Sequence, residues 1–301
     1  MRVLHTFAEV REASVGITSL VPTMGYLHEG HLSLMATARG ESDTVVVSLF
    51  VNPLQFNDQE DLARYPRDLD RDGRLAREAG VDLLFAPPLE VMYPMPALTR
   101  VTVSSLVTEM EGAYRPGHFE GVATVVAKLL AGLQPQRAYL GRKDAQQLAV
   151  IRRMAFDLSF PVDIVGGQTV RESDGLALSS RNVFLDRNER DRALGISRGL
   201  MAAADAFETG ARDAHTLEGK VREMVTGAEV DYVTLADAHT AVPLSGVDRD
   251  AFLAVAARVG STRLIDNVPF LAEPGGAISV DRGFRLSGPS ILYGDRHAID
   301  Y

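Results

Sequence analysis

Short apolar runs alternate with helix-compatible segments through the first half of the chain. Strand-like runs cover residues 17–21, 44–51, 81–86, 137–140 and 162–165. The run at 44–51 (TVVVSLFV) is almost wholly apolar and rich in β-branched residues, which is typical of a strand covered on both faces. Apolar spacing or charge patterning predicts helices between these runs, over residues 27–38, 68–79, 121–133 and 143–158.

Strands separated by helices predict an α/β fold with a doubly wound parallel sheet, that is, a Rossmann-like first domain over residues 1–170. The pattern then changes, because two helices (186–209 and 214–226) precede three strands (230–235, 251–257 and 263–265). We therefore expect a smaller C-terminal α+β domain over residues 171–301. From Val268 onward the Gly- and Pro-rich chain is expected to form extended surface segments without an assigned role.

Polar or glycine-containing segments follow three of the predicted strands. They are PTMG (22–25), NPLQF (52–56) and GRKD (141–144). Ligand sites in doubly wound folds lie beyond the carboxyl ends of the strands. The sequence therefore predicts a site formed by these three segments.

Composition removes several classes of function. The chain has 301 residues with 31 Lys plus Arg against 40 Asp plus Glu, and the net charge of −9 argues against a nucleic-acid partner. The absence of Cys excludes disulfides, thiolate metal sites and a Cys nucleophile. We expect a cytoplasmic protein without a membrane partner, because the N-terminus lacks a signal core and the apolar run at 45–51 is too short to span a bilayer. P-loop, GxGxxG and GxSxG motifs are absent, which disfavours P-loop kinases, simple dehydrogenases and esterases.

The strongest local signal is the sequence HEGH. His28 and His31 share one face in the first turn of a predicted helix, where free backbone N–H groups and the helix dipole favour phosphate. Gly30 would let a ligand approach the backbone. A pair of capping or surface histidines is the alternative interpretation. Zinc is disfavoured, because HExxH requires a four-residue step.

Two further segments suit phosphate oxygens. Ser179 and Ser180 precede Arg181 on a polar loop, although an ordinary polar loop would have the same composition. Lys143 follows a predicted strand directly, and only three of the 31 basic residues are lysine. Its use here indicates a compact point charge, unless its position arose by chance.

Neutral amides and a run of acids complete the candidates. Asn52, Gln55 and Gln147 suit a small ligand with hydroxyl and carboxylate groups, or else they cap helices and line loops. The acids between Asp68 and Asp72 could meet a phosphate-bound Mg²⁺, or form a solvated helix face.

Seven segments occur in an order that resembles the pantothenate synthetase (pantoate–β-alanine ligase) family over about residues 18–267. They are PTMGYLHEGH, FVNPLQF, YPRDLD, RPGHFEGV, GRKDAQQL, TVRESDGLALSSRN and TRLIDN. Each is modest alone, and their joint order is specific. The family belongs to the HIGH-motif nucleotidyltransferases, whose fold is shared with class I aminoacyl-tRNA synthetases.

The resemblance implies a two-step ligation with ATP as substrate and Mg²⁺. ATP and (R)-pantoate would give a pantoyl adenylate and pyrophosphate, and β-alanine would then displace AMP to give pantothenate. A homodimer is implied as well. Two alternatives stay open: another HIGH-type adenylyltransferase that leaves AMP on its product, and a catalytically silent nucleotide-binding regulator.

The same resemblance assigns residues by motif. Those implied in catalysis are His28, His31 (as proton donor), Lys143, Ser179, Ser180 and Arg181. Those implied around ATP are Pro22, Thr23, Met24, Gly25, Gly30, Gly141, Arg142, Asp144, Val170 and Leu178. Gln55, Gln147 and Asn52 would hold substrate, Tyr65 would lie on a covering flap, and Asp72 is the candidate metal ligand.

Three positions depart from the family pattern. Arg142 stands where the family usually has Glu, and Ala145 stands where it usually has an aromatic residue. Leu178 replaces a common Met. Arg142 places a second positive charge beside Lys143. None of these changes removes a functional group assigned above.

Overall fold

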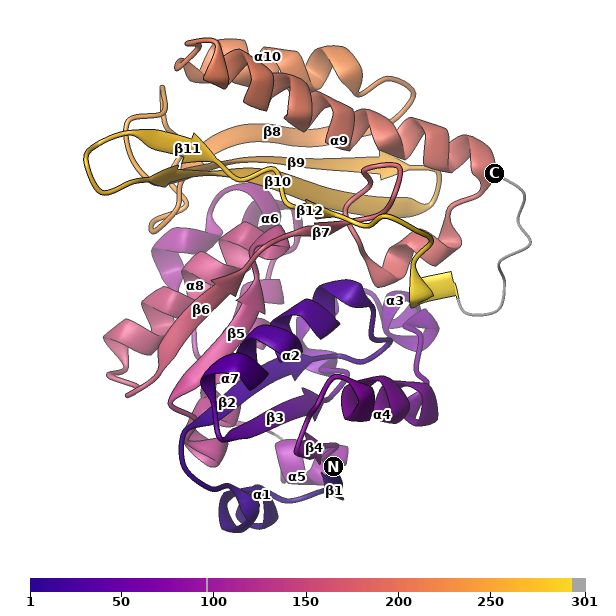
Figure 1. Cartoon of the computed structure of the whole chain (residues 1–301), viewed down its shortest axis with the longest axis vertical. Helices are drawn as coiled ribbons and strands as arrows, with labels where there is room; N and C mark the ends of the chain where they lie inside the picture. Colours follow the sequence, from indigo (N-terminus) through magenta and orange to yellow (C-terminus); the bar gives the residue numbers. More distant parts are fainter. Residues whose placement is uncertain (96, 294–301) are drawn as a thin grey trace. The chain divides into compact units, whose positions relative to one another are not determined.

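The structure is a computed structural model that describes residues 1–95 and 97–293 (Figure 1). The chain divides into two compact units. Unit 1 comprises residues 1–141 and 150–167, and unit 2 comprises residues 142–149 and the chain from residue 168. The expected division lay at residue 170, and the expectation did not separate residues 142–149 from the first domain.

Unit 1 is built on a six-stranded parallel sheet in the order β1-β4-β3-β2-β5-β6. The strands are β1 (Arg2–Leu4), β2 (Thr18–Thr23), β3 (Thr44–Leu49), β4 (Leu83–Phe85), β5 (Arg137–Gly141) and β6 (Asp163–Gly167). This confirms the predicted Rossmann-like class. The winding reverses between β2 and β5, so the carboxyl ends of these strands flank the switch point at which such folds bind ligands.

Helices cover both faces of this sheet. They are α1 (Phe7–Ala13), α2 (Glu29–Glu41), α3 (Gln59–Arg64), α4 (Leu69–Glu78), α5 (Leu89–Met92), α6 (Met110–Tyr114) and α7 (His118–Leu133), with short 3-10 turns η1 (Pro53–Gln55) and η2 (Ser104–Val107). Leu84 packs with residues of α2 and α4 on one face. Because side chains alternate along a strand, Phe85 points to the other face, where its ring lies 4.9 Å from that of Phe7 in α1.

Unit 2 packs two helices on an antiparallel sheet in the order β11-β10-β9-β8 (Figure 1). The helices are α9 (Arg187–Glu208) and α10 (Ala214–Met224), and the strands are β8 (Glu229–Asp237), β9 (Ala251–Val259), β10 (Thr262–Ala272) and β11 (Ile278–Val280). A separate parallel pair joins β7 (Val170–Arg171) to β12 (Phe284–Arg285). Short turns η3 (Arg142–Asp144), η4 (Ser180–Phe184) and η5 (Ile291–Tyr293) accompany them, and α8 (Ala145–Asp157) begins in unit 2 and ends in unit 1.

The expectation of extended surface segments from Val268 onward was wrong for its first part. Strand β10 continues to Ala272, and Val268 and Phe270 are fully buried. The Phe270 ring packs 4.7 Å from that of Phe207 in α9. The proline that suggested a loop, Pro269, precedes Phe270, the first residue paired with β11, and a strand tolerates proline where its N–H has no partner.

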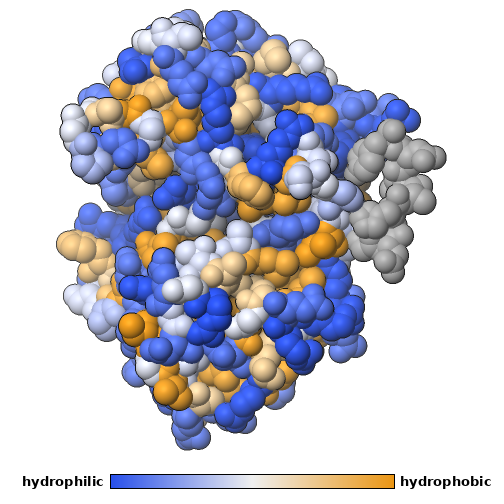
Figure 2. All heavy atoms as spheres, viewed as in Figure 1, coloured by the Kyte–Doolittle hydropathy of each residue, from blue (hydrophilic) through white to orange (hydrophobic). Residues whose placement is uncertain are grey.

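On the face drawn in Figure 2, hydrophobic residues are scattered among hydrophilic ones. Within residues 1–95 and 97–293, no helix is both long enough and apolar enough to cross a bilayer.

Candidate active site

Two histidines shape the loop between β2 and α2. His28 is the N-cap of α2, and its Nδ1 accepts a hydrogen bond from the Gly30 N–H at 3.2 Å. The Nδ1 of His31 accepts from the His28 backbone N–H at 3.3 Å, and the two ring centroids lie 4.1 Å apart. A backbone N–H can only donate, so neither Nδ1 carries a proton, and each neutral ring bears its proton on Nε2.

The capping and phosphate interpretations of this pair are therefore compatible. Capping uses the Nδ1 atoms, and the Nε2–H groups are donors at a helix N-terminus, where an anion is favoured. Gly30 also makes room for the His28 ring, because a Cβ there would lie 2.9 Å from Cε1 of His28.

Asp72 of α4 holds the backbone of the same loop. Its Oδ2 accepts from the Tyr26 N–H and its Oδ1 from the Leu27 N–H, both at 2.7 Å. Tyr26 has a φ of 52°, a left-handed conformation that costs free energy in a residue with a large side chain. Arg71 adds support, because its Nη1 donates to the Leu27 carbonyl at 2.9 Å and lies 3.5 Å from Asp72 Oδ1.

Asp72 is also the predicted metal ligand, and its carboxylate is engaged with the loop. Both of its oxygens accept backbone N–H groups, and burial raises the pKa of the carboxyl while the bonds from Leu27 and Tyr26 oppose that rise. A Cβ on Gly25 would lie 2.9 Å from Asp72 Oδ2, so a glycine is needed beside the carboxylate. Within the described chain, no three His, Cys, Asp or Glu side chains are grouped to hold a metal ion.

Two hydrogen-bonded amide side chains, those of Asn52 and Gln55, follow β3. Asn52 Nδ2 donates to Gln55 Oε1 at 2.9 Å and to the Gly121 carbonyl at 3.0 Å, while Asn52 Oδ1 accepts from the Tyr93 hydroxyl at 2.8 Å. Burial raises the pKa of Tyr93 to about 12, which keeps this hydroxyl a donor. Gln55 is thereby oriented with Nε2 3.1 Å from Met24 Sδ. The structure thus brings the segments after β2 and β3 together. Asn52 orients the side chain of Gln55.

The segment RPGHFEGV supports Gln55 in a way that residue types alone did not reveal. His118 Nδ1 donates to the Gln55 carbonyl at 2.8 Å, and Arg115 Nη1 lies 3.2 Å from His118 Nε2. A Cβ on Gly121 would lie 2.2 Å from the Leu54 carbonyl oxygen, so α7 can approach η1 only with glycine there. The available signal was the motif itself, from which Arg115 or His118 could be interpreted as site residues or as part of a turn.

The other predicted residues of unit 1 lie on the same strands or near them. Pro22 and Thr23 end β2, and the Thr23 hydroxyl donates to the Ser48 carbonyl of β3 at 2.8 Å. Gly141 ends β5. Tyr65 follows α3 and is buried edge-on against Phe56, with ring centroids 5.7 Å apart.

In unit 2, the turn η3 carries Lys143. Asn267 of β10 donates through Nδ2 to the carbonyls of Arg142 (2.9 Å) and Lys143 (2.7 Å), which fixes the turn. Lys143 Nζ lies 3.7 Å from Asp144 Oδ1. Gln147 is half-buried one turn farther along, in the part of α8 that belongs to unit 2.

A buried ion pair joins β10 to β7. Arg171 Nη1 lies 2.6 Å from Asp266 Oδ2 and Nη2 lies 3.2 Å from Oδ1, and the two side chains are 4% and 3% exposed. Asp266 Oδ1 also accepts the Asn267 N–H at 2.8 Å. The dipeptide Asp266-Asn267 therefore connects the strand before the Ser-Ser-Arg turn with the turn that carries Lys143. Neither Arg171 nor this dipeptide had a role assigned from the sequence, although TRLIDN was noted as a motif.

The Ser-Ser-Arg turn begins where the chain folds back from β7. Leu178 N–H donates to the Val170 carbonyl at 2.9 Å, and both residues are buried. Ser179 then caps η4, with its Oγ accepting from the Arg181 N–H at 3.3 Å, and Ser180 is buried in the turn. The structure thus brings Val170 next to Leu178, the residue that directly precedes the predicted phosphate-binding residues.

Asp72→Asn is expected to destabilise the protein. The substitution turns one of the two acceptors into an amide NH₂ that faces a backbone N–H, and leaving such a buried donor without an acceptor costs about 2 kcal/mol. The free energy of unfolding in urea measures the loss. Asp70→Asn, on the exposed face of the same helix, is the matched control, and equal unfolding midpoints for the two variants would contradict the role of Asp72.

Comparison with known proteins agrees with this geometry. The sequence profile of the family described as pantoate-beta-alanine ligase matches residues 2–269. The pantothenate synthetase of Roseiflexus sp. (strain RS-1) is 51% identical over 273 residues, which cover 89% of this chain and 98% of that protein.

Two solved structures are similar as well. Pantothenate synthetase from Thermus thermophilus matches with a TM-score of 0.84 and 51% identity, over 89% of this chain and 98% of its own. Pantoate-beta-alanine ligase from Francisella tularensis, complexed with beta-gamma ATP and beta-alanine, matches with a TM-score of 0.72 and 34% identity, over 92% of this chain and 100% of its own. The chain described here belongs to the pantoate–β-alanine ligase family.

Proposed function

We propose that this chain condenses (R)-pantoate with β-alanine to pantothenate in an ATP-dependent reaction that passes through a pantoyl adenylate. The observation that carries the proposal is the histidine pair at the start of α2, whose Nδ1 atoms cap the helix and whose protons therefore lie on Nε2. Membership in the family supplies the substrates, and the crystal structure of the Francisella relative is a complex with beta-gamma ATP and beta-alanine.

In the first step, a carboxylate oxygen of pantoate bonds to the α-phosphorus of ATP, and the bond to pyrophosphate breaks. Negative charge grows on the phosphate oxygens during this exchange. His28 and His31 supply neutral N–H donors. The motif match assigns the charge of Lys143 and the Ser179–Arg181 turn to the same step, and fixed donors of this kind stabilise developing charge without reorganising.

In the second step, the amine of β-alanine attacks the acyl carbon, the bond to AMP breaks, and the amine releases a proton. Pantoate must be held while this happens, and an amide can bind both its hydroxyl and its carbonyl oxygens. Gln55 suits that task, because Asn52 and His118 fix its side chain and its backbone. Gln147 of α8 is proposed as the second amide.

Three further features are proposed alongside the reaction. Mg²⁺ would be held by the phosphate oxygens of ATP rather than by Asp72, whose oxygens already accept backbone N–H groups. A homodimer follows from the family resemblance alone. A cytoplasmic location suits an enzyme that consumes ATP.

Analysis of the reaction products tests the proposed function directly. The purified protein is incubated with ATP, Mg²⁺, (R)-pantoate and β-alanine, and the mixture is analysed by mass spectrometry. Pantothenate formed in equal amount with AMP is the expected result. A product that retains AMP would point to another adenylyltransferase, and unchanged ATP that still binds would point to a silent regulator.

Replacing His31 separates its capping and donor roles. His31→Asn keeps an oxygen that can accept the His28 N–H but removes the Nε2 donor, so kcat should fall on the order of a hundredfold with little change in stability. His31→Ala should lose the same activity and some stability as well. His215→Ala, at an exposed position of α10, is the control, and a His31→Asn variant with the kcat of this control would remove His31 from the mechanism.

The special role of Lys143 can be checked against a second lysine. Lys143→Ala should raise the KM for ATP or lower kcat by about tenfold, because a charge that interacts with phosphate is lost. Lys128 of α7 lies over the Phe7 ring, with Nζ 5.6 Å from its centroid, so Lys128→Ala should leave the kinetics unchanged. Equal kinetic effects from the two substitutions would refute the assignment.

A further inference from the structure

The described chain continues beyond the family match, which ends at residue 269. Residues 278–293, here called the C-terminal segment, contain β11, β12 and η5. This segment contacts both predicted phosphate-binding turns of unit 2, through Asp281, β12 and Tyr293.

Asp281 makes the first contact. Its Oδ2 lies 3.0 Å from Arg142 Nη1, and its Oδ1 accepts from Gln168 Nε2 at 2.7 Å and from the Gly283 N–H at 2.9 Å. The side chains of Asp281 and Arg142 are 9% and 30% exposed, so this contact is partly shielded from solvent. Arg142 precedes Lys143 in η3, and Asp281 therefore both anchors this turn and compensates the extra positive charge beside Lys143.

Strand β12 makes the second contact. It pairs in parallel with β7, where Phe284 is opposite Val170 and Arg285 is opposite Arg171. Gly283 allows the approach, because a Cβ there would lie 2.5 Å from the Thr169 carbonyl oxygen. The C-terminal segment is thus hydrogen-bonded to the strand from which the Ser-Ser-Arg turn folds back.

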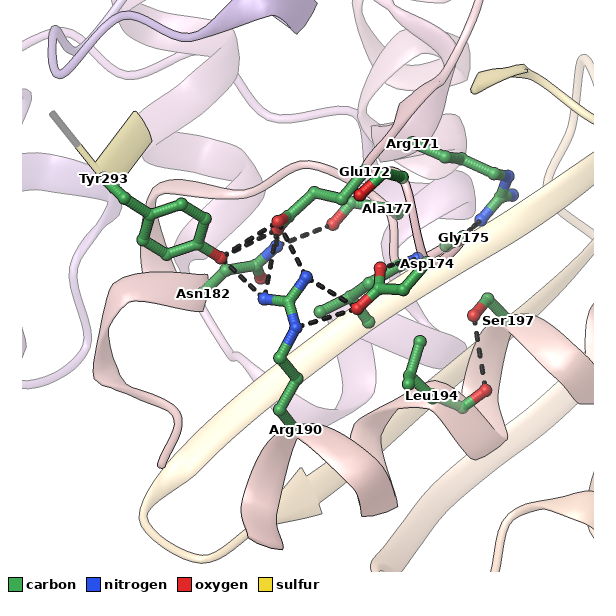
Figure 3. Close-up of polar contacts among 12 residues, drawn as sticks. Arg171, Glu172, Asp174, Gly175, Ala177, Asn182, Arg190, Leu194, Ser197 and Tyr293 are labelled. Atoms are coloured by element: carbon green, nitrogen blue, oxygen red, sulfur yellow. Dashed lines mark hydrogen bonds and ion pairs between the residues drawn. The ribbon is translucent and has the colours of Figure 1, made fainter. Parts of the chain in front are cut away.

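Tyr293 makes the third contact (Figure 3). Its hydroxyl lies 2.6 Å from Arg190 Nη1 and 2.9 and 3.1 Å from the two oxygens of Glu172. The hydroxyl has one proton, so it donates to Glu172 and accepts from Arg190. Burial and the Glu172 carboxylate raise the pKa of Tyr293, which keeps that proton in place.

Glu172 links Tyr293 to the Ser-Ser-Arg turn through hydrogen bonds. Its Oε1 accepts from Asn182 Nδ2 at 2.7 Å, and the same Nδ2 donates to the Ala177 carbonyl at 3.0 Å. Asn182 lies in η4, directly after Arg181. Glu172 and Asn182 are buried, so a change in the direction of the carboxylate must be accommodated by the turn itself.

We propose that the C-terminal segment is a positioning element for the ATP-using step, in which Asp281 holds the turn with Lys143 and Tyr293 holds the turn with Arg181. The inference rests on the proposed function, because it takes both turns to bind the phosphates of ATP. Neither Asp281 nor Tyr293 acts on the substrate, and each works through a side chain of another element.

Two conservative substitutions test the proposal. Tyr293→Phe removes one hydroxyl and keeps the ring, and Asp281→Asn removes one charge and keeps the shape. Each is expected to lower kcat/KM for ATP by about tenfold, because displaced phosphate-binding groups lose alignment with the reacting atoms. The KM for β-alanine should stay within about twofold of the wild-type value, since the second step uses other groups.

The control is Asp231→Asn, which breaks another partly buried Asp–Arg pair of unit 2, where Asp231 Oδ2 lies 2.6 Å from Arg263 Nε. All variants are compared by thermal unfolding and by calorimetric titration with ATP. Tyr293→Phe and Asp281→Asn should bind ATP more weakly than the control does. ATP affinity and kcat/KM equal to those of the control would overturn the proposal, even if the variants unfold at lower temperature.

Failure of the proposed function would look different. A wild-type protein that forms no pantothenate would contradict the reaction and leave the titration with ATP as a separate measurement. Weaker ATP binding by both variants would then still support the positioning role, and unchanged ATP binding would refute it.

Discussion

The buried ion pair between Arg171 and Asp266 is the constraint on which the phosphate-binding part of unit 2 depends. Charges that are nearly fully buried are tolerated only when they are paired and hydrogen-bonded, and removing one partner of such a pair typically costs about 3–5 kcal/mol. The pair holds β7 against β10. The residue after Asp266, Asn267, donates to the carbonyls of the turn that carries Lys143. The dipeptide Asp266-Asn267 therefore fixes both the strand before the Ser-Ser-Arg turn and the turn that carries Lys143.

In unit 1, buried polar side chains also hold the segments that carry the predicted site residues. Asp72 holds two N–H groups of the loop after β2, and Asn52 holds the side chain of Gln55 after β3. In each case a buried polar group on one element satisfies the backbone or side chain of another, which leaves the residue assigned to chemistry with few alternative conformations. The polar groups singled out for function thus depend on a second set of polar groups that hold them.

The C-terminal segment extends this arrangement with residues outside the family match. Arg142 adds a positive charge next to Lys143. Asp281 compensates the charge, and β12 and Tyr293 bring the same segment to the strand and the network behind the Ser-Ser-Arg turn. The departure at residue 142 and the C-terminal segment are therefore in direct contact.

Hydrophobic periodicity by itself determined the fold class and most of the elements, because burial of a strand or of a helix face imposes a local pattern that a single sequence displays. Motif spacing likewise indicated His28, His31, Gln55, Lys143 and the Ser-Ser-Arg turn, since phosphate and small-acid chemistry requires particular residue types at strand ends. Only the tertiary structure decided the roles of Asp72, Asp266, Asn267 and Tyr293, and the burial of Val268 and Phe270. Their partners are distant in sequence, as in the 95 residues between Arg171 and Asp266, and no local pattern records which distant groups a fold will place within hydrogen-bonding distance.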